Sequence, residues 1–127
     1  MKLVSGNSNR NLAENIGKYL NTPLADCTVK KVSDKEIFIE MNENCRGEDV
    51  FIIQSTSFPA NDNLMEVLIL IDTLKRASAK RITAVVPYFG YARQDRKDEP
   101  RVPISARVLL DLMNVVGINR IMAMDLH

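Results

Sequence analysis

The sequence has only two cysteines, one histidine and no tryptophan, and it lacks any long apolar run. Cys27 and Cys45 have neither metal-ligand spacing nor a cluster of histidines beside them, so we expect reduced thiols rather than a zinc site. The apolar run near the N-terminus consists of Leu3 and Val4 alone, far short of a signal-peptide core. No segment approaches the roughly 18 apolar residues of a membrane helix. These absences predict a soluble, cytoplasmic protein with no membrane partner.

The sequence also has no excess of charge of one sign. Its 17 basic and 16 acidic residues give a formal net charge of +1. This balance argues against a nucleic-acid partner bound over a broad basic face, so any anion site must be local. The GxxxxGK phosphate loop is absent, and a nucleotide would therefore have to be held by side chains from several loops. With 127 residues, 46% of them hydrophobic, the chain has the size and apolar content of one soluble domain.

Short apolar runs alternate with helical patterns along the whole chain. Strands are expected at residues 3–4, 28–32, 37–41, 50–53, 82–86 and 120–126. Helices are expected to start after Ser8 or Asn9, at Asn61 or Asn63, and at Pro103. This order predicts an α/β fold, with a mostly parallel open sheet flanked by helices and an early antiparallel hairpin. Because an α/β unit seldom ends on a strand, we expect the natural protein to continue past His127.

The apolar positions of the helices predict which faces are buried. The first helix should bury one face, made of Leu12, Ile16, Tyr19 and Leu20. The last helix should be organised in the same way, with Ile104, Val108, Leu112 and Val115 along it and Gly117 as its C-cap. The middle helix is apolar nearly all round, with Asn63 and Glu66 at capping-box spacing. Such a helix is expected to pack against the sheet and against another subunit.

Residues 87–105 form the most charged connection in the chain, between a strand and a helix. Loops at the ends of buried strands are where open α/β sheets bind ligands, although a charged loop can also be a solvated surface connection. Two aromatic residues, Phe89 and Tyr91, flank Gly90 just before the arginine at position 93 and favour the ligand-binding alternative. Arg93 and Gln94 together offer a planar set of donors and an amide, which suits phosphate oxygens and a ribose or base edge.

Two further places carry candidate ligand groups. Asp34 and Glu36 present carboxylates at alternate positions of the hairpin tip, although a charged tip can simply be solvated. His127 follows Asp125 at the end of a strand, where an imidazole can bind a metal ion or transfer a proton. A lone histidine is more often incidental, so neither place identifies a function on its own.

Four segments of the sequence together resemble the ribose-phosphate diphosphokinases, also called phosphoribosyl pyrophosphate (PRPP) synthetases. These segments are NENCRGEDVFIIQST, NDNLMEVLILIDTLKRASAKRITAV, VVPYFGYARQDRKDEPRVPISAR and MDLH. The resemblance covers essentially all of residues 1–127 and corresponds to the N-terminal, ATP-binding domain of the family, which has a phosphoribosyltransferase-like fold. It implies synthesis of PRPP for nucleotide biosynthesis, by transfer of the β,γ-diphosphate of ATP to ribose 5-phosphate.

The resemblance also implies a set of site residues and a quaternary structure. The hairpin tip and the arginine-containing loop form the ATP site in this family, with Mg²⁺ bound by the histidine of the DLH block. ATP contacts are therefore expected at Asp34, Lys35, Glu36, Arg93 and Gln94, with Asp95, Lys97 and Asp98 beside them and the metal at His127. The family forms homo-oligomers, commonly hexamers, in which a neighbouring subunit donates the hairpin tip.

Two departures from the family pattern leave alternatives open. Val32 stands where the family usually has a phenylalanine, so a face for stacking adenine is lost or supplied elsewhere. The ribose-5-phosphate loop and the catalytic lysine and arginine belong to the C-terminal domain of the family, and no position here matches them. Residues 1–127 alone are therefore expected to be inactive. The alternatives are a non-catalytic regulatory or assembly subunit of a PRPP synthetase, and a generic α/β nucleotide-binding module.

Overall fold

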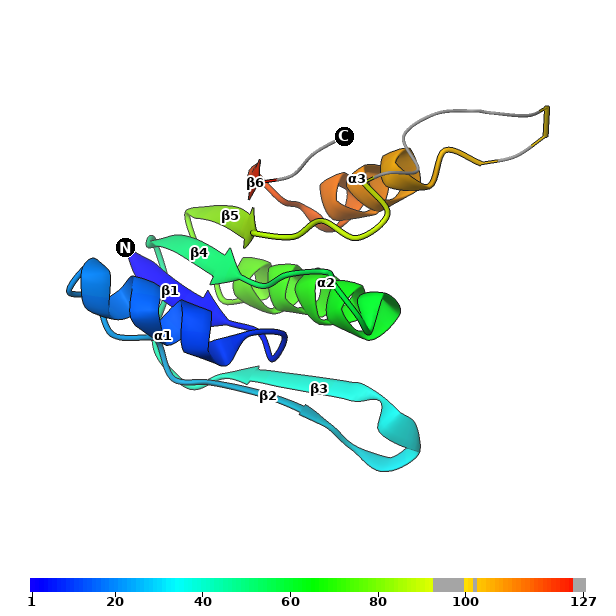
Figure 1. Cartoon of the computed structure of the whole chain (residues 1–127). Coiled ribbons are helices and arrows are strands. Elements are labelled where there is room, and N and C mark those ends of the chain that lie inside the picture. Colours follow the sequence, from blue (N-terminus) through cyan, green and yellow to red (C-terminus); the bar gives the residue numbers. More distant parts are fainter. Residues whose placement is uncertain (93–99, 102, 125–127) are drawn as a thin grey trace.

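A parallel sheet of four strands forms the centre of the computed structural model, which describes residues 1–92, 100–101 and 103–124 (Figure 1). The strands lie in the order β1 (Lys2–Ser5), β4 (Asp49–Ile53), β5 (Arg81–Val86) and β6 (Arg120–Ala123). A separate antiparallel hairpin is formed by β2 (Cys27–Lys31) and β3 (Ile37–Met41). The predicted fold class is thereby confirmed.

Side-chain alternation along the strands gives the sheet two apolar faces. One face, which includes Leu3 and Ile53, packs against Ala13 of α1 (Arg10–Tyr19). The other face is covered by α2 (Ala60–Arg76) and α3 (Ser105–Val116). Its buried strand residues are Val4, Val50, Ile52, Ile82, Ala84 and Val86. The continuous apolar runs seen in the sequence are therefore strands that are buried from both sides.

Helix α2 is apolar nearly all round because elements of the same chain surround it. The sheet covers one side of α2, and strand β3 of the hairpin contacts another side (Figure 1). Ile39 and Met41 of β3 pack against the same core as Leu70 and Leu74 of α2. We expected α2 to pack against the sheet and also against another subunit; within this chain the hairpin covers part of its apolar circumference, while Met65 is 48% exposed.

The predicted buried face of α1 is wrong at its C-terminal end. Tyr19 is 90% exposed, whereas Ala13 and Gly17 are buried. A Cβ atom at Gly17 would lie 2.7 Å from the carbonyl oxygen of Thr22, so the helix passes too close to the following turn for a larger residue. The small side chains, rather than the large apolar ones, therefore determine how α1 packs. The predicted cap is confirmed, since the Asn9 side chain accepts a hydrogen bond from the backbone N–H of Leu12.

Helix α3 buries a different stripe from the predicted one. Leu109 and Met113 face the core, while the predicted stripe of Ile104, Val108, Leu112 and Val115 lies at the surface. The helix carries two apolar stripes, and periodicity alone does not show which of them meets the sheet. The helix also begins at Ser105 rather than at Pro103. Its predicted end is confirmed, because Gly117 adopts the left-handed conformation with a φ of 110°.

Candidate functional site

The loops that follow β4 and β5 meet at the carboxyl edge of the sheet and are joined by hydrogen bonds. The backbone N–H of Thr56 donates to the carbonyl of Tyr88 at 2.9 Å, and the N–H of Gly90 donates to Oγ1 of Thr56 at 2.7 Å. A Cβ atom at Gly90 would collide with the carbonyl oxygen of Thr56, so only glycine allows this close approach. The start of the predicted ligand loop is therefore held rigidly against its neighbour.

Aromatic side chains surround this junction, but not in the arrangement that the sequence indicated. Phe89, one of the two aromatic residues that favoured ligand binding by this loop, is buried in the hydrophobic core. Tyr91 is half-buried, and its hydroxyl donates a 2.6 Å hydrogen bond to Oδ1 of Asn61. Two aromatic residues that the sequence analysis missed lie at the surface, since Phe58 is 95% exposed and Tyr88 is 48% exposed. Phe58 could have been identified from its position in the loop that follows the buried strand β4, because binding residues are often found in such loops.

Three hollows follow one another from this junction towards the hairpin. The first, of about 270 Å³, lies between Phe58, Tyr88 and Tyr91. The second, of about 410 Å³, shares Phe58 and Tyr91 with the first and is also lined by Asn61 and Asp62. The third, of about 440 Å³, shares Asn61 and Asp62 with the second and reaches the hairpin tip. Shared lining residues therefore make these hollows one extended surface.

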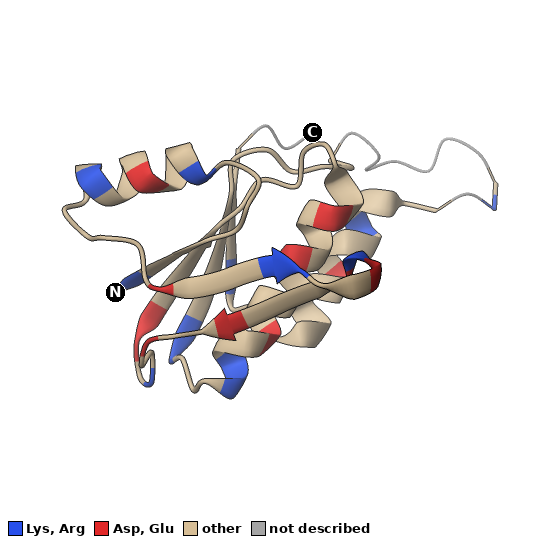
Figure 2. Ribbon diagram, turned by 90° about the horizontal axis from the view of Figure 1, so that it is seen from below, with Lys and Arg blue, Asp and Glu red and all other residues tan. Residues whose placement is uncertain are grey.

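The hairpin tip places the predicted residues Asp34, Lys35 and Glu36 together at the surface. Lys35 and Glu36 line the third hollow. Asp34 and Lys35 both have a φ of 61°, a left-handed conformation that is unusual for residues other than glycine and that stores backbone strain. Basic and acidic residues occur together along the hairpin and its tip (Figure 2).

An ion pair docks the hairpin on α2. Nζ of Lys31 lies 3.0 Å from Oδ2 of Asp62, in the first turn of the helix. Both side chains are about half exposed, so this pair contributes little to stability but helps to orient the tip. The tip of this chain is thereby held beside the hollows that lead to Tyr91.

The second group of predicted site residues falls outside the part of the chain that the structure describes. This group contains Arg93, Gln94, Asp95, Lys97, Asp98 and the proposed metal ligand His127. The described chain leads to the edge of the group, because Ala92 is buried and its N–H donates to the carbonyl of Phe89 at 3.2 Å. The described part of this loop therefore ends, at Ala92, on the junction between the two loops.

A buried polar cluster, which the sequence analysis missed, supports the carboxyl edge. Asn63 and Glu66 do not form the predicted capping box, because α2 begins at Ala60 and both residues lie inside it. The carboxylate of Glu66 instead accepts hydrogen bonds from the backbone N–H of Asn7 at 2.9 Å and from Nε2 of Gln54 at 3.0 Å. Glu66 is only 5% exposed. These bonds tie the loops after β1 and β4 to α2.

The described part of the chain offers few side chains that could bind a metal ion or react as a thiol. Within residues 1–92, 100–101 and 103–124, no three histidine, cysteine, aspartate or glutamate side chains are grouped closely enough to hold a metal ion. Cys27 and Cys45 are free thiols. Burial raises the pKa of Cys27 to about 11 and also raises the pKa of Cys45, so both thiols stay protonated and unreactive near neutral pH.

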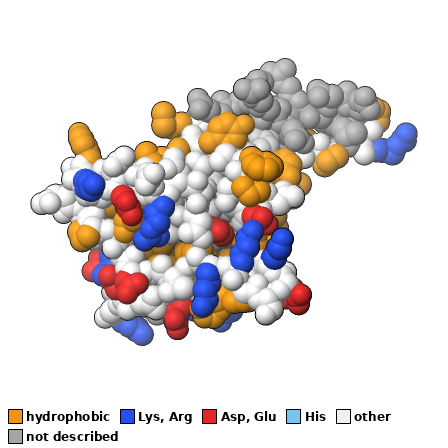
Figure 3. All heavy atoms as spheres, turned by 60° about the horizontal axis from the view of Figure 1, so that its bottom comes forward, with side chains coloured by type: hydrophobic (Ala, Val, Ile, Leu, Met, Phe, Trp, Pro, Cys, Tyr) orange, Lys and Arg blue, Asp and Glu red, His pale blue; other side chains and the backbone are white. Residues whose placement is uncertain are grey.

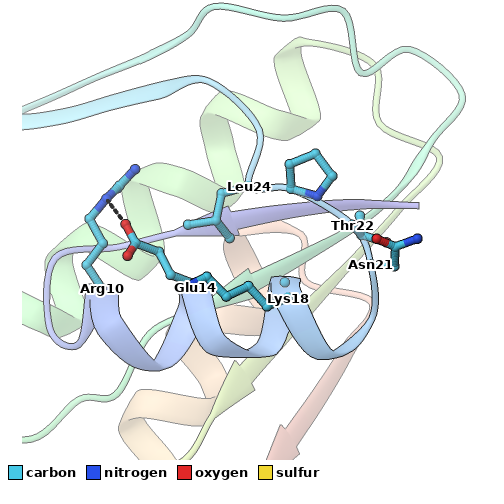
Figure 4. A pocket seen from close by; sticks show the side chains of 8 residues that line it. Arg10, Glu14, Lys18, Asn21, Thr22 and Leu24 are labelled. Atoms are coloured by element: carbon cyan, nitrogen blue, oxygen red, sulfur yellow. Dashed lines mark ion pairs between the residues drawn. The ribbon is translucent and has the colours of Figure 1, made fainter.

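A further hollow, of about 440 Å³, lies along α1 and uses none of the predicted site residues (Figure 4). Arg10 and Glu14 point towards each other there, with Nε of Arg10 3.8 Å from Oε1 of Glu14. Lys18 and Leu24 also line this hollow. The charged residues of this hollow are Arg10, Glu14 and Lys18, and they alternate with apolar groups along one side of α1. They do not form a set of catalytic groups. We therefore place the candidate site at the carboxyl edge instead.

The charge distribution on the surface does not indicate a nucleic-acid partner or another large charged partner. On the face shown in Figure 3, basic and acidic side chains are interspersed with hydrophobic ones. This distribution agrees with the formal net charge of +1. Among the helices of the described residues, none has the length and apolar character needed to cross a membrane.

Comparisons with known proteins agree on one family. The family model for the N-terminal domain of ribose phosphate pyrophosphokinase matches residues 1–117. A ribose-phosphate pyrophosphokinase from Agrobacterium fabrum is 65% identical over 127 residues, and one from Brucella melitensis is 60% identical over the same length. In both comparisons all of this chain is matched, and it spans 41% of the length of the relative.

A solved structure shows the same fold. The chain superposes on phosphoribosylpyrophosphate synthetase from Mycobacterium smegmatis with a TM-score of 0.96 and 45% sequence identity. The match covers 99% of this chain and 42% of that structure. The hairpin and the parallel sheet are therefore arranged here as they are in a known member of that group.

Proposed function

The chain belongs to the ribose-phosphate pyrophosphokinase family, and on this premise we propose that it forms the ATP-binding domain of an enzyme that makes PRPP. One observation supports this proposal most strongly. The extended surface of three hollows connects the hairpin tip, with Lys35 and Glu36, to Tyr91, two residues before Arg93. The hairpin tip and the described residues that precede Arg93 thereby lie along the same edge of the sheet, and we propose this edge as the ATP site.

The proposed reaction transfers the β,γ-diphosphate of ATP to ribose 5-phosphate. The anomeric hydroxyl of the sugar attacks the β-phosphorus, the bond from this phosphorus to the bridging oxygen of the α-phosphate breaks, and AMP leaves. The hydroxyl proton is released as the new P–O bond forms. Such a transfer depends mainly on positioning and on neutralisation of phosphate charge. Arg93 and Gln94 would hold the phosphates and the ribose, with Asp95, Lys97 and Asp98 beside them, while Asp34, Lys35 and Glu36 bind from the hairpin side.

Magnesium is the cofactor that this reaction implies, since Mg²⁺ bound to a triphosphate neutralises part of its charge. The described residues do not form a metal site of their own. We propose His127 as the protein ligand, because imidazole nitrogen can bind a metal ion. In the protein that carries this chain, His127→Ala should raise the Mg²⁺ concentration needed for half-maximal activity. An unchanged Mg²⁺ dependence would remove His127 from the proposal.

We also propose that the protein is a homo-oligomer, and the exposed stripe of α3 supports this better than α2 does. Val115 is 81% exposed, and Ile104, Val108 and Leu112 are also at the surface. An apolar stripe of this kind is typical of a surface that is covered in an assembly. Val115→Lys should lower the mass measured by analytical ultracentrifugation, with Arg107→Lys on the same helix as the control. An unchanged mass would place the contact elsewhere.

The experiment that tests the proposed function is formation of AMP from Mg-ATP and ribose 5-phosphate by the protein that carries this chain. AMP should form only when ribose 5-phosphate is present. Arg93→Ala should lower kcat about 100-fold or more, as expected when a donor to a developing phosphate charge is removed. Arg76→Ala, at the exposed end of α2, is the matched control and should leave the rate unchanged.

The same experiment separates the proposal from the alternative of a non-catalytic regulatory or assembly subunit. Val32, in place of an aromatic residue at the hairpin, is the observation that favours this alternative, and its side chain is exposed. A protein that binds ATP, forms the oligomer and yields no AMP would support the alternative. Normal activity in Arg93→Ala would contradict the role assigned to that arginine.

A further inference from the structure

Asn7 is bonded to two other elements of the fold. It lies in the turn after β1, and its backbone N–H donates to Oε1 of Glu66 at 2.9 Å. Its side-chain nitrogen Nδ2 donates to the carbonyl of Val29, in strand β2 of the hairpin, also at 2.9 Å. The same nitrogen lies 3.4 Å from Oε2 of Glu66. One residue therefore joins the carboxyl edge of the sheet to α2 and to the hairpin.

Glu66 holds this turn from a buried position. It is only 5% exposed, and no lysine or arginine of the described residues forms an ion pair with it. Its carboxylate is satisfied instead by the N–H donors of Asn7 and by Nε2 of Gln54. Removal of donors from a buried carboxylate is costly, so the turn has little freedom to move away from Glu66.

The N–H groups of this turn are already bonded inside the chain. In many α/β proteins the first turn after a strand, at the start of a helix, binds a phosphate group. Here the N–H of Asn7 donates to Glu66, and the N–H of Ser8 donates to Oε1 of Gln54 at 3.0 Å. The carboxylate of Glu66 accepts the bond that an anion would otherwise accept. The turn therefore supports neighbouring elements rather than binding phosphate itself.

The hairpin depends on such supports because it is separate from the main sheet. In the described chain, β2 and β3 pair with each other and with no strand of that sheet (Figure 1). An isolated two-stranded hairpin is only marginally stable in water. Strand β3 packs against α2, while the bond from Asn7 holds β2 at Val29, two residues before the ion pair of Lys31 with Asp62. The direction of the tip therefore depends on supports for both strands.

We propose that Asn7 is a positioning residue of the ATP site, which together with Glu66 sets the direction of the hairpin and thereby the place of Lys35 and Glu36 at its tip. This inference rests on the proposed function. Asn7 acts through the hairpin and needs no contact with ATP of its own. The family resemblance implies that the tip contributes to the site of a neighbouring subunit, and the direction in which it leaves its own subunit then determines whether it reaches that site.

Asn7→Ala tests the bond to the hairpin in the protein that carries this chain. The variant keeps the backbone N–H that donates to Glu66 and loses the side-chain donor to Val29. The KM for ATP should rise about five-fold, because loss of one hydrogen bond lowers the fraction of hairpins that point in the competent direction. The kcat and the KM for ribose 5-phosphate should stay unchanged. Asn15→Ala, at an exposed position of α1, is the matched control and should change neither KM.

The melting temperature and amide exchange of Asn7→Ala show whether the change is confined to the hairpin. Exchange should become faster in residues 27–41 and stay unchanged in β4 and β5. Asn7→Ser, which keeps a polar side chain in the turn but loses the amide, is the second variant if alanine lowers the melting temperature. A five-fold rise in the KM for ATP is expected there too, by the same loss of one hydrogen bond.

A double-mutant cycle shows whether Asn7 acts through the tip. Asn7→Ala is combined with a tip variant that carries Lys35→Ala and Glu36→Ala. If the tip transmits the effect, Asn7→Ala should change the KM for ATP by less than about 1.5-fold in the tip variant, since coupled residues are not additive. Asn7 is exposed, so direct contact with ATP is the alternative. A five-fold effect in both backgrounds would support that alternative and overturn the inference.

The outcomes separate this inference from the proposed function. Wild-type protein that forms AMP, with an unchanged KM for ATP in Asn7→Ala and Asn7→Ser, overturns the inference and leaves the proposed function intact. A tip variant with the KM of wild type removes the hairpin from the ATP site and also overturns the inference, while AMP formation still supports the proposed reaction. Wild-type protein that forms no AMP overturns both.

Discussion

The hydroxyl of Tyr91 donates a 2.6 Å hydrogen bond to Oδ1 of Asn61, and this bond joins the loop after β5 to the first turn of α2. The two residues are 30 positions apart in the chain. Both residues line the second hollow; Tyr91 also lines the first hollow, and Asn61 also lines the third. The geometry of the site therefore depends on contacts between loops as well as on the residues expected to touch ATP.

Tyr91→Phe should remove this connection while the aromatic ring is kept. A hydrogen bond of this kind typically contributes about 0.5–1.5 kcal/mol, so the free energy of unfolding should fall by about that amount. Urea unfolding of the variant measures the change. Tyr19→Phe is the matched control, because Tyr19 is almost fully exposed. Equal stability of Tyr91→Phe and wild type would show that the bond has no structural role.

Glu66→Gln tests the buried polar cluster. The substitution keeps the size of the side chain but places an amide among the N–H donors of Asn7 and Gln54. A donor facing donors in a buried place is left unsatisfied, so the free energy of unfolding should fall by about 1–3 kcal/mol. Glu14→Gln on the exposed side of α1 should change it by less than about 0.5 kcal/mol. An equally small change in the free energy of unfolding for both variants would show that the buried polar cluster does not stabilise the fold.

Lys35→Gly tests the strain at the hairpin tip. Lys35 has a left-handed conformation, with a φ of 61°, which glycine adopts without steric cost. Relief of that strain outweighs the extra freedom of glycine in the unfolded chain, so the variant should be about 0.5–1 kcal/mol more stable. Lys30→Gly, in the extended strand β2, should have the opposite effect. Thermal unfolding that showed a loss of stability in both variants would rule out strain at Lys35.

The pH dependence of stability should reflect the buried thiol of Cys27. Burial, with a smaller contribution from Asp26, raises the pKa of this thiol from its ordinary value of 9.0 to about 11. The unfolded chain therefore loses this proton at a lower pH than the folded chain does. The corresponding stability is fully present below pH 9 and is lost as the pH rises towards 11. Cys27→Ser should flatten the decline in unfolding free energy over this interval, and parallel curves for variant and wild type would contradict the account.

The sequence predicted those parts of the fold that depend on local patterns. Apolar runs such as residues 50–53 and 82–86 correspond to the buried strands β4 and β5, and the alternation of Ile37, Phe38 and Ile39 corresponds to the hairpin. The buried side of α3 was not predictable in this way, because the helix carries two apolar stripes and only the packed core selects between them.

The candidate site was predictable only where it coincides with sequence motifs. The hairpin tip was identified from its charged residues and from the family resemblance. Phe58 and Tyr88 were missed because their importance depends on the meeting of two loops from neighbouring strands. The bond between Asn7 and Glu66 was also beyond prediction, since it joins residues 59 positions apart. Conversely, Phe89 has the spacing of a site residue, but its side chain belongs to the core.

Hydrogen–deuterium exchange with and without Mg-ATP tests the central claim most directly, namely that ATP binds at the carboxyl edge between the hairpin tip and the loop before Arg93. ATP should slow amide exchange in residues 33–37, 55–62 and 88–92. Exchange in residues 10–24, which contain the separate hollow along α1, should not change. Protection confined to residues 10–24, or no protection at the carboxyl edge when ATP is bound, would contradict the claim.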